Sequence, residues 1–482
     1  MIKLLSDFSG QILFVLLIVC GAYFTVRSRF VQCRYFLHMF SVFSEALSRS
    51  KENVTSFQAL MISVAGRVGS GTIAGVGVAL ALGGPGAIFW MWVTAALGMA
   101  SSFFECTLAQ LYKRNGGDGV YFGGPAYYIR HGLGQHWLGI LISLILIITP
   151  AFGFNSVQAH IITHSLKESF GIPLATSTIG VVVILGLVIT GGIRRIATIS
   201  DTLVPIKILC YLGVTLFVIF VQIRHLPEAI AVLFRSAFGI DPVFGGLVGS
   251  AITMGAKRGL FANEAGLGTA PNVAAVAEVK HPVAQGVVQS LSVFTDTFIM
   301  CTCTALLILL SGAYHSHQQG DGVTLTQHSV AMVVGSWGSP FISVILVLFA
   351  FTTIYYNYYL GENNLRFIFG RNRLILFLYR FLVLVLVFWS GKESLNIVLT
   401  FADTTMTLLA LVNLVALVLL FKIGLRVMDD YQEQRKAGIA EPVFDSAKFS
   451  DLDLDLTAWK KIARPAGSSI EGGSLSESYQ NS

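Results

Sequence analysis

The chain has 482 residues, of which 54% are hydrophobic and 12% are charged, and its formal net charge is +6. Soluble domains carry about 25% charged residues, and the mean hydropathy here is +0.72. These values exclude a large soluble enzyme and indicate an all-α membrane protein that crosses the bilayer many times. The basic residues are scattered over short loops, so no nucleic-acid partner is expected. The 6 cysteines lie mostly in or beside apolar runs and show no metal or disulfide spacing.

Apolar runs recur along the whole chain and predict about eleven transmembrane helices. The first run lacks a strongly basic flank and a cleavage site, so we expect it to remain as a helix rather than be removed as a signal peptide. From about residue 425 the chain is polar, which predicts a soluble tail whose last 15 or so residues are disordered. The expected spans are 10–26, 57–82, 86–112, 136–163, 176–193, 196–222, 246–272, 283–311, 339–367, 372–389 and 395–422.

Lysine and arginine set the expected orientation. They are frequent in the 27–56 loop and in every second loop after it, and they are sparse on the opposite side. Because cytoplasmic loops carry the excess of these residues, the N-terminus is predicted outside and the tail in the cytoplasm. The expected location is the plasma membrane of a bacterium, which is the inner membrane in a Gram-negative cell.

Two of the spans are interrupted by glycines and charges. One contains "GRVGSGTIAGVGVALALGGPG" (66–86) and the other "KRGLFANEAGLGTAP" (257–271). They lie five spans apart, so they enter the membrane in opposite directions, as in inverted-repeat transporters with a binding site at mid-membrane. The predicted organisation is an extra helix and basic loop (1–56), a first five-helix repeat (57–222), an external loop (223–245), a second repeat (246–424) and the tail (425–482).

A helix break of this kind can bind both ends of an amino acid. The free N–H groups that begin the second half-helix attract a carboxylate, and the carbonyls that end the first half-helix attract a cation or an ammonium group. Three other interpretations of the first segment stay open. Gly71 and Gly75 have the spacing of a helix-packing motif, "GSGTIAG" resembles a weak dinucleotide fingerprint, and the helix could be kinked without any ligand.

Several polar residues at membrane depth are candidates for function. Arg67 is costly in hydrocarbon, so it is expected either to gate the site or to form an ion pair with Glu105 or Glu264. Asn263 and Glu264 are expected to cap or line the second break. Asp296 would carry a proton or ion, or cap an internal polar network, and the same alternatives hold for Asp403.

Further candidates lie on other spans. Gln158 is expected either to donate a hydrogen bond to a substrate carboxylate or to form a hydrogen bond with another helix. His160, two residues later, points away from Gln158 on a helix and is expected to serve packing. Thr352 and Thr353 offer adjacent hydroxyls for Na⁺, although threonine often bonds to its own helix.

Long motifs in the chain resemble the alanine or glycine:cation symporter family. They are "YFTVRSRFVQCRYF", "RVGSGTIAGVGVALALGGPGAIFWMWVTAALGMASSFFECTLAQLYK", "GGPAYYI", "KRGLFANEAGLGTAPNVAA", "VKHPVAQG" and "GENN". The resemblance implies a fold like that of the bacterial leucine transporter, with five-plus-five inverted repeats, discontinuous helices and one extra helix in front. It also implies uptake of a small neutral amino acid such as alanine or glycine, with Na⁺, in some members H⁺, as the coupling ion and no other cofactor.

The resemblance also assigns residues. The substrate carboxylate would meet the amides of Ser70 and Gly71, helped by Gln158, and the amino group would meet backbone near Gly259 and Phe261. The Na⁺ ligands would be the carbonyls of Ala65 and Val68 and the hydroxyls of Thr352 and Thr353.

Three positions depart from the family pattern. Thr72 and His160 stand where asparagine is usual, and Leu399 stands where tryptophan is frequent. Thr72 puts any sodium site that needs the asparagine amide in doubt. The changed pocket wall leaves a larger neutral substrate such as glutamine open.

Two other classes of function are less well supported. An ion channel would need a symmetric pore of carbonyls or charged rings, whereas the broken segments occur once each. An intramembrane enzyme would need a nucleophile with its base or a metal cluster, and no such constellation is seen in the sequence.

Overall fold

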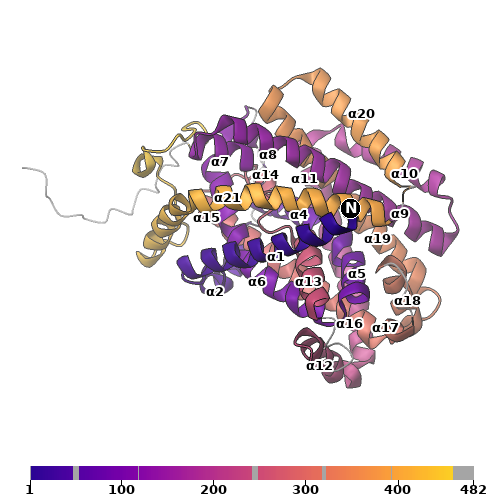
Figure 1. Cartoon of the computed structure of the whole chain (residues 1–482). Coiled ribbons are helices and arrows are strands. Elements are labelled where there is room, and N and C mark those ends of the chain that lie inside the picture. Colours follow the sequence, from indigo (N-terminus) through magenta and orange to yellow (C-terminus); the bar gives the residue numbers. More distant parts are fainter. Residues whose placement is uncertain are drawn as a thin grey trace, which may run out of the picture.

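The computed structural model describes residues 2–46, 54–117, 119–240, 248–316, 322–391, 393 and 395–459. The regular elements of these residues are helices, apart from one short hairpin in which Arg114 pairs with Phe122 and Asn115 with Tyr121. The fold is therefore all-α, as the sequence predicts (Figure 1).

The elements follow one another along the chain in two stretches. Up to residue 240 they are α1 (Ile2–Arg27), α2 (Val31–Arg34), α3 (Phe36–Ala46), α4 (Ser56–Arg67), η1 (Ser70–Thr72), α5 (Ala74–Gly83), α6 (Gly86–Leu111), β1 (Arg114–Asn115), β2 (Tyr121–Phe122), α7 (Pro125–Gly132), α8 (His136–Ile148), η2 (Thr149–Phe154), α9 (Asn155–Phe170), α10 (Leu174–Ile189), α11 (Gly192–Val221), η3 (Ile223–His225) and α12 (Leu226–Ala237). After residue 247 they are α13 (Val248–Asn263), α14 (Ala270–Ala274), α15 (Pro282–Phe294), η5 (Thr295–Cys301), α16 (Thr302–Leu310), α17 (Ala313–Ser316), α18 (Gly322–Val334), α19 (Gly338–Phe369), α20 (Arg373–Ser390), α21 (Leu395–Lys436) and η6 (Ser446–Phe449).

Seven helical segments of the described chain are long and apolar enough to cross a membrane, and the bent pair of α4 with η1 and α5 makes an eighth. Gln11–Arg27 and Leu174–Ile189 are shorter apolar helices at two further predicted spans. The chain is thus a multi-pass membrane protein. The expected number of eleven spans stays a prediction, because the predicted span 246–272 is split between α13 and α14.

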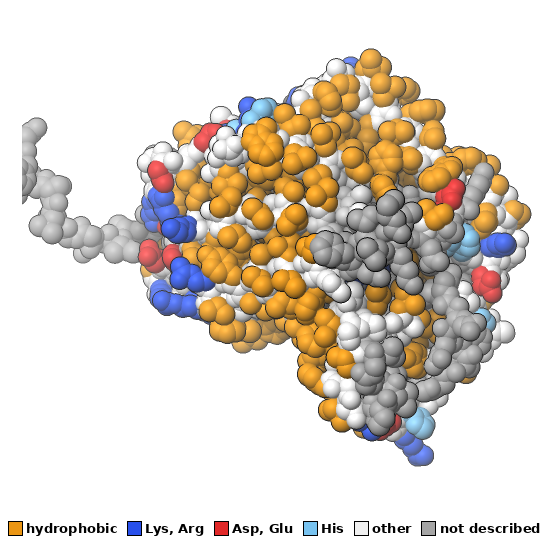
Figure 2. Space-filling view, viewed as in Figure 1, with side chains coloured by type: hydrophobic (Ala, Val, Ile, Leu, Met, Phe, Trp, Pro, Cys, Tyr) orange, Lys and Arg blue, Asp and Glu red, His pale blue; other side chains and the backbone are white. Residues whose placement is uncertain are grey.

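The outer surface fits a lipid environment. Figure 2 shows hydrophobic side chains over most of one face, with charged side chains mainly at the left, right and lower edges of the view. The outer helix α20 exposes large apolar side chains, among them Leu374, Phe377 and Phe381. Such a continuous apolar surface would drive aggregation in water, and it is stable when hydrocarbon covers it.

The centre of the molecule contains the two interrupted segments. All of α4 from Ala59 to Arg67 is buried, as is α13 from Gly255 to Asn263. Helix α6 packs against α13 and α15, and α19 packs against α9 and α4. The glycine-rich segments are therefore surrounded by other helices, which allows their irregular backbone to lie away from lipid.

The first part of the predicted tail is ordered and packs against the body of the protein. Helix α21 continues to Lys436, beyond the predicted end of the span at residue 422, and the following chain folds back onto the body. The Phe444 amide donates to the Lys280 carbonyl (2.9 Å), and the Trp459 indole donates to the Leu111 carbonyl (3.2 Å). The predicted disorder of the last 15 or so residues lies outside the described residues.

Candidate functional site

The first break separates α4 from α5. Helix α4 ends at Arg67, the chain is not α-helical until Ala74, and the two helical parts are bent by 52°. Glycine is required here because other elements approach the backbone closely. A Cβ atom at Gly66 would lie 2.2 Å from the Tyr356 ring, and one at Gly69 would lie 2.3 Å from the Thr353 hydroxyl.

The predicted carboxylate site lies in the turn η1. Within the described chain, no backbone hydrogen bond is made by the amides of Ser70 and Gly71, and the buried Ser70 hydroxyl has no partner. A Cβ atom at Gly71 would lie 2.9 Å from the Phe261 ring and 3.3 Å from its carbonyl oxygen. The structure thus brings Ser70, Gly71 and Phe261 together, with donors that remain available to a ligand.

One of the two glycines expected to pack against a neighbouring helix does not do so. A Cβ atom at Gly75 would meet no atom within 4 Å, whereas one at Gly77 would lie 2.5 Å from the Gly322 carbonyl oxygen. The expected packing role of Gly71 and Gly75 is therefore wrong for Gly75. The close helix contact is made by Gly77 in α5 against Gly322 in α18.

The second break follows α13. Helix α13 ends at Asn263, and positive φ angles at Glu264 (52°), Gly266 (83°) and Gly268 (79°) carry the chain to α14. The Asn263 side chain accepts from the Ala265 amide (3.0 Å) and donates to the Thr297 hydroxyl (3.1 Å). Asn263 therefore caps this break.

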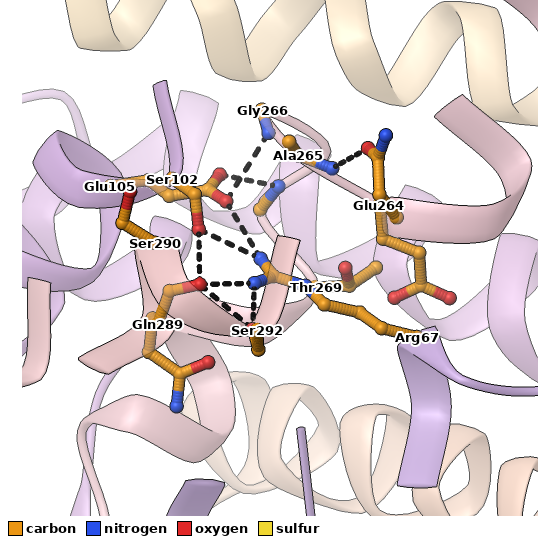
Figure 3. A network of polar contacts seen from close by, with 12 residues as sticks. Arg67, Ser102, Glu105, Glu264, Ala265, Gly266, Thr269, Gln289, Ser290 and Ser292 are labelled. Carbon is orange, nitrogen blue, oxygen red and sulfur yellow. Dashed lines mark hydrogen bonds and ion pairs between the residues drawn. The ribbon is translucent and has the colours of Figure 1, made fainter. Parts of the chain in front are cut away.

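A buried ion pair connects the two breaks (Figure 3). Arg67 and Glu105 are fully buried, and their nearest charged atoms are 3.7 Å apart. Glu105 also accepts from the amides of Gly266 (3.2 Å) and Gly268 (3.0 Å) in the second break. One carboxylate thus holds the irregular loop and faces the arginine that ends α4.

The remaining donors of Arg67 bind neutral oxygens. Its Nη1 donates to the Gln289 carbonyl (2.7 Å) and the Ser292 hydroxyl (2.5 Å), and its Nη2 donates to the Ser102 hydroxyl (2.9 Å). Of the two carboxylates predicted as partners, Glu105 forms the ion pair. Glu264 instead accepts from the Tyr356 hydroxyl (3.0 Å).

Asp296 lies in the π-helical turn η5 and contacts the first break. Its oxygens accept from the hydroxyls of Thr72 (2.6 Å) and Thr297 (3.1 Å). Thr72, which stands where the resemblance leads us to expect asparagine, therefore binds the Asp296 carboxylate directly. Asp296, Thr72, Thr297 and Asn263 form one hydrogen-bonded chain that joins the two breaks a second time.

The predicted cation ligands lie together. The hydroxyls of Thr353 and Thr352 donate to the Ala65 carbonyl at 2.9 and 3.4 Å. A residue that the sequence analysis did not single out lies beside them: the Lys207 amine donates to the Val68 carbonyl (2.7 Å) and to the Thr352 hydroxyl (2.6 Å). Sodium binding by these oxygens stays a prediction, and the structure adds an ammonium group at the same place.

The structure also pairs Asp403 with Arg258, which the sequence analysis did not name. Both oxygens of Asp403 accept from Nη2 of Arg258, and the pair is buried. Arg258 lies 5.5 Å from the centre of the Phe261 ring. The only sequence signal was its position within the segment 257–271, which glycines and charges interrupt.

The last predicted residues are placed as follows. Gln158 is buried, and its Oε1 finds no partner among the described residues. His160 stacks on His164, with ring centres 3.7 Å apart, and its Nδ1 lies 2.8 Å from the Glu393 carbonyl. Gly259 faces α6, where a Cβ atom would lie 2.9 Å from the Thr94 hydroxyl. Leu399 is partly buried on α21.

Taken together, the fold and the site define a polytopic membrane transporter. A bundle of apolar helices surrounds two broken segments with free amides and buried charges at its centre, and the described residues contain no group of three metal-ligating side chains. The chain matches the sodium:alanine symporter family over residues 1–446 and belongs to that family. The predicted resemblance is confirmed, and the family consists of transporters rather than enzymes.

Named relatives cover nearly the whole chain. It is 44% identical over 453 residues to the amino-acid carrier protein AlsT of Bacillus subtilis, covering 94% of this chain and 96% of AlsT. It is 43% identical over 436 residues to the probable sodium/glutamine symporter GlnT of the same organism, covering 90% of each chain. The putative sodium/proton-dependent alanine carrier protein YrbD, also from B. subtilis, is 39% identical over 468 residues and is covered to 95%, with 94% of this chain aligned.

Proposed function

We propose that this protein carries a small neutral amino acid into the cell by symport with a cation. The observation that supports the proposal most directly is the break between α4 and α5, where the amides of Ser70 and Gly71 lack acceptors among the described residues and Gly71 lies beside Phe261. Backbone N–H groups at the start of a helix bind carboxylates. Alanine and glutamine appear in the names of the relatives and are the first substrates to test.

The substrate would be held at both ends. Its carboxylate would accept from the Ser70 and Gly71 amides, and the buried Gln158 is the further donor that the family resemblance suggests. Its ammonium group would meet backbone carbonyls at the end of α13, where Phe261 has its carbonyl 3.3 Å from the position of a Gly71 Cβ. The Phe261 and Phe154 rings, 5.2 Å apart, would form an apolar wall for the side chain.

The proposed architecture is the five-plus-five inverted repeat of the bacterial leucine transporter, with residues 57–222 and 246–424 as repeats after an extra helix within 1–56. Two discontinuous segments, one in each proposed repeat, support it. The N-terminus would lie outside a bacterial plasma membrane and the tail in the cytoplasm. The buried pairs of Arg67 with Glu105 and Arg258 with Asp403 would hold the breaks in place or open during the cycle.

The test is substrate counterflow in proteoliposomes. Vesicles that contain the purified protein are loaded with unlabelled alanine, glycine or glutamine and diluted into labelled alanine or glutamine, with equal ions on both sides. We expect the label to accumulate transiently, and a panel of competing amino acids would rank the substrates. Absence of counterflow with every neutral amino acid would contradict the proposal, and a steady ion current without counterflow would favour a channel.

A further inference from the structure

A basic cavity lies at one end of the bundle, where three of the predicted cytoplasmic loops meet. Its volume is about 400 Å³. Its wall is formed by the hairpin of β1 and β2, the turn between α10 and α11, the last turns of α19 and the start of α20. The charged side chains in the wall are Arg194, Arg366, Arg371, Arg373 and Glu362. The residues described in this wall include none that we assign to substrate or Na⁺, so the cavity is separate from the two breaks.

The protein neutralises the positive charge of this cavity only in part. The Arg366 guanidinium donates to the Glu362 carboxylate (2.6 Å), and a nitrogen of Arg380 lies 3.7 Å from the other oxygen of the same carboxylate. Glu362 is therefore already shared by two arginines. Arg371 and Arg373 are exposed and form no ion pair in the part of the chain that the structure describes. Their guanidinium groups remain available to an anion.

The cavity wall also contains hydrogen-bond donors without acceptors. Helix α11 begins at Gly192, and no side chain caps its N-terminus. The amides of Gly192 and Ile193 donate to no backbone oxygen of the described residues. Tyr359 lies in the wall as well, and its buried hydroxyl finds no partner among those residues. Uncapped amides at the start of a helix bind phosphate groups, so the backbone and the arginines favour the same kind of ligand.

The surface next to the cavity is apolar. Leu376 of α20 belongs to the wall, and α20 lies at the edge of the bundle (Figure 1). On the same helix Leu374 is 65% exposed and Phe377 is 64% exposed. Helix α20 is long and apolar enough to cross a membrane, and Arg373 is its first residue. The arginines of the cavity are therefore at the level of the lipid headgroups, directly beside a helix face that contacts acyl chains.

We propose that this cavity binds a phosphate group and that the group belongs to an anionic phospholipid of the surrounding leaflet. Arginine binds phosphate oxygens in pairs through its planar fork, and basic pockets between membrane helices suit anionic headgroups. The headgroup lies between Arg371, Arg373 and the start of α11, and the acyl chains follow the exposed face of α20. A zwitterionic lipid is disfavoured because its cationic end meets the arginines.

Such a lipid would connect the two proposed repeats. The turn between α10 and α11 lies in the first repeat, and α19 and α20 lie in the second. One headgroup bound to both adds contacts that the folded protein has and the unfolded protein lacks, so binding stabilises the fold. This inference does not depend on which substrate or ion is transported.

The experiment follows thermal unfolding of the purified full chain in micelles of a neutral detergent. Phosphatidylglycerol is titrated into the micelles, and phosphatidylcholine serves as the zwitterionic comparison. We expect phosphatidylglycerol to raise the apparent melting temperature by several degrees and phosphatidylcholine to leave it nearly unchanged. Each basic residue near an anionic lipid surface contributes about fivefold in affinity, so Arg371→Gln combined with Arg373→Gln should need about 30-fold more phosphatidylglycerol for half of the shift.

The matched control is Arg27→Gln combined with Arg29→Gln. It removes two exposed arginines at the end of α1, on the same predicted side of the membrane and outside the cavity wall. This variant should respond to phosphatidylglycerol like the wild type. Each protein is compared with its own lipid-free melting temperature, so a change in basal stability does not obscure the result.

A separate arm identifies the source of the phosphate group. Inorganic phosphate, compared with chloride at equal ionic strength, is expected to leave the melting temperature unchanged. A shift with inorganic phosphate as large as that with phosphatidylglycerol, and lost in the cavity variant, would overturn the lipid assignment in favour of a free phosphate ligand. Equal responses of the wild type and the cavity variant to phosphatidylglycerol, or equal stabilisation by phosphatidylcholine, would overturn the site. Counterflow is not measured here, so these failures leave the proposed function intact.

Discussion

Replacing Glu105 by glutamine tests whether the buried ion pair holds the two breaks together. The substitution keeps the size and planar shape of the side chain and removes the charge that faces Arg67 at 3.7 Å. Glutamine can still accept from one of the two amides in the second break, Gly266 or Gly268, with its single carbonyl oxygen. The arginine keeps its neutral partners and loses its counter-ion.

The expected cost follows from the geometry. Two unit charges 3.7 Å apart interact by about 4.5 kcal/mol at an effective dielectric constant of about 20. Removing one partner of a buried pair typically costs about 3–5 kcal/mol, because the other charge stays buried without compensation. We therefore expect Glu105→Gln to lower the free energy of unfolding by about 3–5 kcal/mol.

The assay is unfolding of the purified protein in mixed micelles with increasing SDS. The matched control is Glu441→Gln, because Glu441 pairs with Lys280 at the surface, where both side chains are about half exposed. An exposed pair contributes about 0–1 kcal/mol, so the control should unfold close to the wild type. Adding Arg67→Met to Glu105→Gln should restore part of the lost free energy of unfolding, because it removes the unpaired charge. A loss below about 1 kcal/mol for Glu105→Gln, or a double variant no more stable than Glu105→Gln, would refute the assigned role of the pair.

Three other predictions follow from the structure. Gly71→Val should abolish counterflow, because its side chain would enter the space beside Phe261, while the purified variant should still elute as a single monodisperse peak. A variant that binds substrate as tightly as the wild type would show that this glycine serves another purpose. Gly77→Ala should lower the apparent melting temperature by several degrees because its Cβ would meet the Gly322 backbone, while Gly75→Ala, with no atom within 4 Å, should not; equal melting temperatures would contradict this. Burial lowers the pKa of Lys113 to about 7, whereas the pKa of a lysine in the unfolded chain is about 10.4. Between these pH values the unfolded state binds more protons than the folded state, so the free energy of unfolding should rise with pH. Lys113→Met should flatten that rise in melting temperatures measured from pH 6 to 9.5, and an unchanged slope would count against it.

The hydrophobic pattern alone determined much of this protein. Apolar runs of bilayer length require helices in lipid, and the structure has membrane-length helices at most of the predicted positions. The breaks were also visible in the sequence, since clustered glycines and charges do not fit a continuous apolar helix. The segment 66–86 is interrupted after Arg67, and the segment 257–271 after Asn263.

Only the tertiary structure decided which residues meet. Arg67 had two candidate carboxylates, and helix packing selected Glu105. Gly75 and Gly77 are chemically identical in the sequence, and only the approach of α18 distinguishes them. The sequence places Lys207 139 positions from Val68 in an ordinary span, and the packing of α11 against α4 and α19 brings its amine to the predicted cation ligands. Local pattern fixes where a helix can form or break, because those preferences act over a few residues, whereas the partner of a buried charge depends on contacts between helices that are distant in the chain.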